Sequence, residues 1–150
     1  MGYTHYFRRA PKLEKKEFKL FAKDVVKIFE FAKENGILLA DGLGEKGTLP
    51  VADDEMIRFN GLEEHSFETM AIDRIAREQP SDDGKVFNFC KTGRRPYDEI
   101  VTAVLVCFKL HFPSAEIDSD EEGFDEGKEI CEKLFSVAPQ KAGREERKND

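Results

Sequence analysis

The segment with the clearest potential for chemistry joins an apolar run to the expected start of a helix. Lys91, Arg94 and Arg95 gather three cations directly before Pro96. Proline favours the first turn of a helix, and the free N–H groups and positive dipole end of a helix N-terminus attract anions. The combination predicts a binding site for a phosphate-bearing ligand. A solvated basic loop is the alternative.

Two further residues in this segment could complete the site, because Thr92 offers a hydroxyl group and Tyr97 an aromatic ring. The cysteine–arginine spacing of phosphatases is not satisfied, since Pro96 stands where an arginine would have to follow Cys90. The Walker pattern also fails, because its leading glycine and its Gly-Lys-Ser/Thr order are missing. The segment therefore indicates binding of a phosphate group and no particular reaction.

A group of residues near the N-terminus could contact the same ligand. Tyr3, His5, Arg8 and Arg9 lie on or directly after a β-prone run. Aromatic rings stack on nucleotide bases, and arginine pairs with phosphate. We therefore expect Tyr3, His5 and Arg8 to take part in ligand binding; packing on a sheet surface is the alternative.

A glycine-rich loop has the spacing of a dinucleotide-binding pattern at Gly42, Gly44 and Gly47. Extended residues follow it at 48–51 in place of a helix, so the helix N-terminus that would hold a pyrophosphate is missing. We expect a connecting or mobile loop. The sequence leaves open whether this loop and residues 91–95 share a pocket.

The acidic stretch near residue 120 partly matches a calcium-binding loop. Asp118, Asp120, Glu122 and Glu129 stand at ligand positions, but Glu122 is longer than the usual Asp or Asn, and Asp125 replaces an apolar residue. The alternative is an acidic turn that caps the following helix. The sequence favours that turn, and no metal site is expected.

The histidines and the remaining acidic residues do not show the spacing of a metal-binding motif. His5, His65 and His111 show no metal-ligand spacing. Asp53 and Asp54 could hold a divalent ion for phosphodiester chemistry, yet the Glu-x-Lys of nucleases does not follow on a later strand. A solvated turn is the favoured interpretation of this acidic run.

The elements that must position these residues follow from apolar periodicity and turn signals. We expect strands at residues 3–7, 56–59, 67–72, 86–90 and 115–117, and helices at 13–34, 97–112 and 123–137. The strands at 56–59, 67–72 and 86–90 most economically form an antiparallel meander. The sequence predicts one α+β domain over residues 1–138, with a mostly antiparallel sheet and about three helices packed on one face, followed by a disordered charged tail at 139–150.

Composition limits the class of function. The chain has 150 residues and a net charge of −7, which argues against binding to bulk nucleic acid or to anionic membranes. No run approaches the roughly 20 apolar residues of a membrane span. Three cysteines without paired spacing indicate reduced thiols, with Cys107 and Cys131 buried in apolar helices. We expect a cytoplasmic location.

Three stretches carry a resemblance to known sequences: MGYTHYF at 1–7, RFNG at 58–61 and FNFCKTGRRPYD at 87–98. They resemble a group of small uncharacterised proteins of tailed phages and bacteria. The resemblance covers most of residues 1–137. It implies a phage accessory protein that acts in a host cytoplasm, in a setting where small proteins neutralise host components, including nucleotide immune signals.

The leading hypothesis is therefore a binding protein for a phosphate-bearing small ligand, such as a nucleotide, with no cofactor. A binding role is favoured over an enzymatic one. An acidic inhibitor of a host protein is the second hypothesis, motivated by the net charge of −7. The third is a metal-dependent phosphoesterase that uses Asp53, Asp54 or His5.

Overall fold

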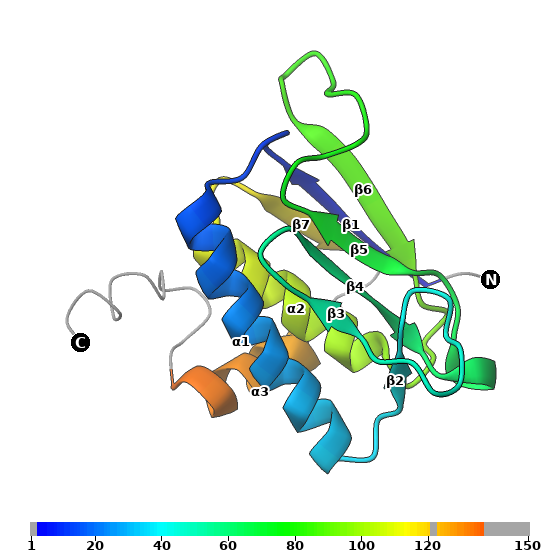
Figure 1. Cartoon of the computed structure of the whole chain (residues 1–150). Coiled ribbons are helices and arrows are strands. Elements are labelled where there is room, and N and C mark those ends of the chain that lie inside the picture. The colour runs from blue at the N-terminus through cyan, green and yellow to red at the C-terminus, as the bar shows by residue number, and fades with distance from the viewer. Residues whose placement is uncertain (1–2, 121–122, 137–150) are drawn as a thin grey trace.

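The computed structural model describes residues 3–120 and 123–136 of the chain (Figure 1). The strands are β1 (Thr4–Arg9), β2 (Leu39–Ala40), β3 (Val51–Ala52), β4 (Met56–Gly61), β5 (Met70–Asp73), β6 (Val86–Lys91) and β7 (Glu116–Ser119). The helices are α1 (Lys15–Glu34), α2 (Asp98–His111) and α3 (Asp125–Phe135), with a short 3-10 turn at Glu63–His65. The tail predicted to be disordered lies outside the described residues.

The strands form two antiparallel sheets. β1 lies between β6 and β7 in the first sheet, and β2, β3 and β5 all pair with β4 in the second. A bridge between Lys12 and Ile75 links the segment that follows β1 of the first sheet to the segment that follows β5 of the second. The buried guanidinium of Arg9 reinforces this junction, because it donates to the carbonyl oxygens of Ala10 at 3.0 Å and Arg74 at 3.1 Å.

The predicted meander is wrong in its third strand. β4 and β5 pair as expected, whereas β6 pairs with β1 along its whole length. The Asp83-Gly84 turn signal belongs to the loop before β6, where the N–H of Ser81 donates to the carbonyl of Lys85 at 2.8 Å. Pairing with β1 turns Val86 and Cys90 of β6 toward the core.

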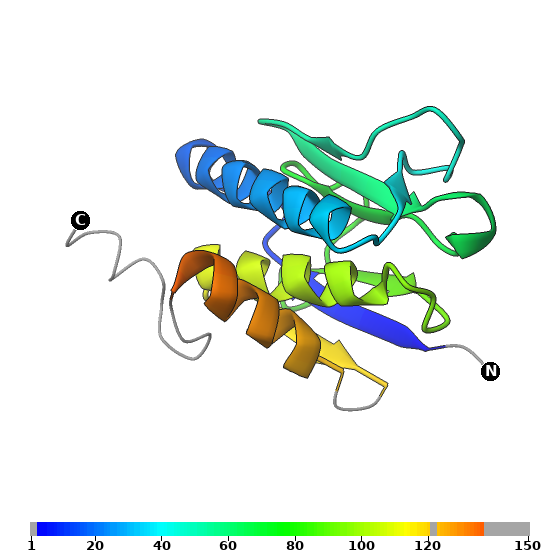
Figure 2. The same ribbon diagram turned by 90° about the horizontal axis from the view of Figure 1, so that it is seen from below.

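All three helices lie on one side of the strands, as Figures 1 and 2 show together. α1 carries the predicted apolar stripe, with Phe18, Phe21, Val25 and Ile28 fully buried. It ends at Glu34 with Asn35 as its C-terminal cap, and Gly36 follows with φ of +73°, the left-handed conformation that suits glycine. The predicted α+β architecture with helices on one face is confirmed.

α2 is the central helix of the domain. Every residue from Ile100 to Phe108 is buried, because the helix is covered by the first sheet, by α1 and by α3. Phe7 of β1 meets Phe108 with ring centroids 5.9 Å apart. Among the described residues, no helix is long and apolar enough to cross a membrane.

Candidate functional site

The N-terminal turn of α2 contains a buried polar network. The hydroxyl of Thr92 donates to Oδ1 of Asp98, and Nε2 of His5 lies 2.6 Å from the same oxygen. All three residues are buried. Nδ1 of His5 has no hydrogen-bond partner among the residues that the structure describes. Asp98, which the sequence analysis did not include among the candidate ligand-binding residues, is the centre of this network.

The two arginines of the basic segment stack on different rings. The guanidinium carbon of Arg94 lies 4.1 Å from the ring centre of Tyr3, and that of Arg95 lies 5.6 Å from the ring centre of Phe67. Arg94 reaches this position with φ of +60°, directly after Gly93 with φ of +58°. The structure thus brings Tyr3 and Arg94 together, beside the network of His5, Thr92 and Asp98.

Two carboxylate side chains lie in the first turn of α2, next to the segment where the sequence analysis expected a phosphate group to bind. These are Asp98 and Glu99. Burial raises the pKa of Glu99, and the nearby carboxylates of Glu126 and Asp98 raise it further. An incoming phosphate would meet these carboxylates at the helix end, so the positive end of the helix dipole is already compensated.

Three residues predicted near the ligand have structural roles elsewhere. Tyr97 is fully buried, its hydroxyl donates to the carbonyl of Glu68 at 2.6 Å, and burial raises its pKa. Its ring therefore cannot stack on a bound base. Arg8 pairs with Asp83 at the far end of β1 from Lys91, and Arg9 is buried at the sheet junction.

An aromatic row on the outer face of the first sheet escaped the sequence analysis. Phe87 and Phe89 of β6 are 44% and 51% exposed. Tyr6 of β1 stacks against Phe87 with ring centroids 6.0 Å apart and planes inclined by 26°. Lys91 is also exposed and follows Phe89 on the same face, because alternate residues of a strand point the same way. The sequence signal for this row was the alternation along β6, where Phe87, Phe89 and Lys91 alternate with Val86, Asn88 and Cys90.

Carboxylates line the opposite margin of this outer face. Arg8 pairs with Asp83 and with Glu116, and Lys85 pairs with Glu116 at 2.8 Å. The hydroxyl of Tyr6 donates to Asp120 at 2.7 Å, and this hydrogen bond raises the pKa of Tyr6. The face is therefore acidic along β7 and carries Lys91 along β6.

The residues of the calcium candidate do not form a calcium loop within the described residues. Asp118 lies in β7, and Asp120 accepts hydrogen bonds from the N–H of Thr4 and from Tyr6. Glu129 is an exposed residue of α3, and Glu122 lies outside the described residues. The expected capping role is also wrong, because α3 begins after Phe124 with no side-chain cap from the described residues.

The glycine-rich loop and the basic segment are neighbours through Phe67. The side chain of Asn60 donates to the carbonyls of Gly42 and Phe67, and a β-carbon on Gly93 would lie 3.1 Å from the ring of Phe67. The Asp53 carboxylate accepts from the N–H groups of Glu55 and Met56, and so shapes a turn.

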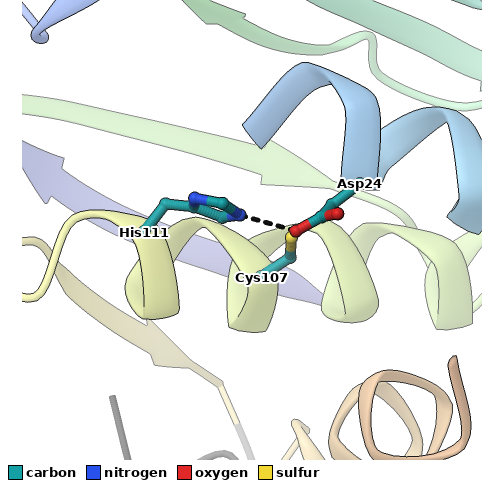
Figure 3. A group of neighbouring side chains, drawn as sticks. All are labelled: Asp24, Cys107 and His111. Atoms are coloured by element: carbon teal, nitrogen blue, oxygen red, sulfur yellow. Dashed lines mark hydrogen bonds and ion pairs between the residues drawn. The ribbon is translucent and has the colours of Figure 1, made fainter. Parts of the chain in front are cut away.

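A second buried polar cluster joins α1 to α2 (Figure 3). Nε2 of His111 lies 2.7 Å from Oδ2 of Asp24, and Nδ1 lies 2.6 Å from Oε2 of Glu17. Figure 3 shows the Cys107 sulfur beside the Asp24 carboxylate, and one potential ligand atom each from Asp24, Cys107 and His111 lies within 4.8 Å of the others.

The sequence analysis missed this cluster, since it found no metal-ligand spacing for His111 and treated Cys107 as a plain buried thiol. The available signal was the spacing of four between Cys107 and His111 in an apolar helix, which puts both on one side. Its third member, Asp24, comes from a helix far away in the sequence.

Comparison of the chain with protein-family models, with curated proteins and with solved structures found no match in any of the three. The description of the protein therefore rests on its structure. It is an α+β domain with an aromatic outer sheet face and two buried polar clusters.

Proposed function

We propose that the protein binds a small phosphate-bearing ligand with a planar ring, such as a nucleotide, on the outer face of the β6-β1-β7 sheet. The observation that supports this most is the row of rings formed by the half-buried Tyr6 and the exposed Phe87 and Phe89, with Lys91 at its end. The rings would stack on the base, and the Lys91 ammonium group would pair with the phosphate.

The dimensions of a strand suit such a ligand. Residues two apart on one face of a strand are separated by about 6.5–7 Å, so Lys91 lies one such step beyond Phe89. Arg94 and Arg95 follow in the next turn and add positive charge at this end of the strand. The sequence hypothesis of a phosphate ligand at the basic segment is thus retained, with exposed rings replacing the buried ring of Tyr97.

The acidic margin along β7 favours a short ligand over a polymer. Asp118 and Asp120 would repel a second phosphate placed beyond the aromatic row. The net charge of −7 would also repel a polyanion at long range. The resemblance to small phage proteins adds a setting to this proposal, in which the ligand is a nucleotide of the host cytoplasm.

Titration calorimetry with mono-, di- and cyclic nucleotides tests the proposal. Stacking of a base on an aromatic side chain contributes about 1–3 kcal/mol, so Phe89→Ala should weaken the affinity by about 5- to 150-fold. Lys91→Ala should weaken it as well, with a reduced dependence on salt. Leu49→Ala is the matched control, because Leu49 is 78% exposed in the loop before β3, which belongs to the other sheet.

A flat titration with every nucleotide would contradict nucleotide binding. An equal loss of affinity in Leu49→Ala would contradict the location of the site.

A second function, binding of a partner protein, is favoured by an apolar groove between α1 and the second sheet. The groove has a volume of about 470 Å³. It is lined by apolar side chains that include Val26, Phe29, Leu38, Leu49, Pro50 and Leu62. Exposed leucines in an otherwise charged surface are typical of interaction sites.

Host lysate passed over the immobilised protein tests this second function. A stoichiometric partner that Leu49→Glu no longer retains would support it, and a column that retains nothing would count against it. The phosphoesterase hypothesis gains no such support, because Asp53 and Asp54 lie in the turn between β3 and β4, whereas His5 is buried in the other sheet against Asp98.

A further inference from the structure

We propose that Asp24, Cys107 and His111 bind a zinc ion that joins α1 to α2 (Figure 3). One oxygen, one sulfur and one nitrogen atom of these residues lie within 4.8 Å of one another, and all three residues are buried. Zinc bonds of about 2.0–2.3 Å in a tetrahedral site place the ligand atoms about 3–4 Å apart. The three donors therefore need only small side-chain rotations to share one ion.

Glu17 supplies the outer contact that metal-binding histidines commonly have. Its Oε2 lies 2.6 Å from Nδ1 of His111. A histidine that donates from one ring nitrogen to a carboxylate keeps the other nitrogen as an electron-pair donor, and the carboxylate fixes the orientation of the ring. Glu17 thus directs Nε2 of His111 toward Asp24 and Cys107.

A bound zinc ion would replace the hydrogen bond that joins two of these donors. Nε2 of His111 and Oδ2 of Asp24 are 2.7 Å apart. A metal ion could use all three donors at once, because one ligand atom each from Asp24, Cys107 and His111 lies within 4.8 Å of the others.

The mixture of donor atoms selects the metal. Calcium and magnesium prefer oxygen ligands alone, whereas zinc accepts cysteine, histidine and aspartate together. The second oxygen of Asp24 or a water molecule would complete four-fold coordination. We therefore expect divalent zinc and not a hard cation.

The surroundings favour a structural ion. Cys107 and His111 lie one turn apart on the central helix, and the ring of Phe21 lies 5.7 Å from that of His111. A cavity of about 220 Å³, lined by Arg9, Leu13, Glu14 and His111 among others, borders the cluster at His111. The ion would fix the packing of α1 on α2, and no role in ligand binding at the outer sheet face is needed.

The test begins with elemental analysis of the full chain purified without a metal-chelating tag, followed by replacement of the bound metal with cobalt. We expect about one zinc per chain, since the cluster offers a single set of three donors. The cobalt protein should show visible bands of tetrahedral coordination and a thiolate-to-cobalt charge-transfer band in the near ultraviolet. Cys107→Ser should lose the charge-transfer band. Cys90→Ser should keep it, because Cys90 lies in β6 with its thiol near the carbonyl of Glu68.

Glu17→Gln gives a second test that does not remove a ligand. Loss of an outer-shell partner commonly weakens metal affinity by about 10–100-fold, which competition with a coloured chelator measures even if Cys107→Ser does not fold. The proposal is overturned if the wild-type chain contains no zinc and gives no charge-transfer band with cobalt. It is also overturned if a folded Cys107→Ser variant retains that band.

Discussion

The most informative residues of this protein are polar side chains that meet inside it. Asp98 forms hydrogen-bond contacts with Thr92, six positions earlier in the sequence, and with His5, 93 positions earlier. Buried polar groups cost free energy unless they are hydrogen-bonded, so such a network specifies one arrangement of β1 against α2. The same holds for Glu17, Asp24 and His111 between α1 and α2.

Replacing Thr92 with valine should destabilise the fold. Valine keeps the shape of threonine but removes the hydroxyl that donates to Asp98, and an unsatisfied buried group costs about 1–3 kcal/mol. Chemical denaturation measures the loss. Thr92→Ser is the control, because it keeps the hydroxyl and should lose less; equal stability of Thr92→Val and wild type would contradict the role of this network.

The helices depend on a close approach that only glycine allows. A β-carbon on Gly127 of α3 would lie 2.5 Å from the carbonyl carbon of Thr102 on α2. Alanine is favoured over glycine within a helix by about 1 kcal/mol, so local propensity alone predicts that Gly127→Ala stabilises the protein. The crowded contact predicts the opposite sign.

We expect Gly127→Ala to lower the free energy of unfolding by about 1–3 kcal/mol, because overpacking of a close contact forces the two helices apart. Urea denaturation of the variant and of Lys128→Ala provides the comparison. Lys128 is the exposed neighbour, and its replacement should change stability by about 0.5 kcal/mol or less. A stabilised Gly127→Ala variant would show that α2 and α3 do not pack this closely.

The stability of the whole molecule should decline in alkaline solution. Burial raises the pKa of Cys90 and of Cys131 to about 12, from an ordinary value of 9.0. The unfolded chain therefore releases these protons at a lower pH than the folded chain does. The stabilisation is complete below the unfolded pKa and is lost as the pH rises from about 9 through the folded pKa of about 12.

Urea denaturation at a series of alkaline pH values measures this decline. Cys90→Ser should show a shallower decline than wild type, because serine does not ionise in this range. A free energy of unfolding that stays level over the same range would contradict the burial of these thiols.

Local patterns predicted the long elements of the fold because their information is contained in neighbouring residues. The apolar periodicity that predicted helices at 13–34 and 97–112 is carried by Phe18, Phe21, Val25 and Ile28 in α1 and by the run from Ile100 to Phe108 in α2. The partner of β6 was not predictable in this way. Its turn signal at Asp83-Gly84 suits either a hairpin or a loop, and the choice depends on which strand covers the core.

The candidate sites divide in the same manner. Basic residues at 91–95 were visible as a cluster in the sequence, but the direction of each side chain was not. Only the tertiary structure buries Tyr97, exposes Phe87 and Phe89, and surrounds the start of α2 with carboxylates.

The sequence by itself determined the α+β class, the apolar faces of the helices and the acidic charge, because periodicity and composition are local properties. Only the tertiary structure decided that His5 meets Asp98 and that Asp24 meets His111, since these pairs lie 93 and 87 positions apart. Contacts across such separations leave no periodic pattern in the sequence. They form because packing of the apolar faces brings otherwise unrelated polar residues within bonding distance.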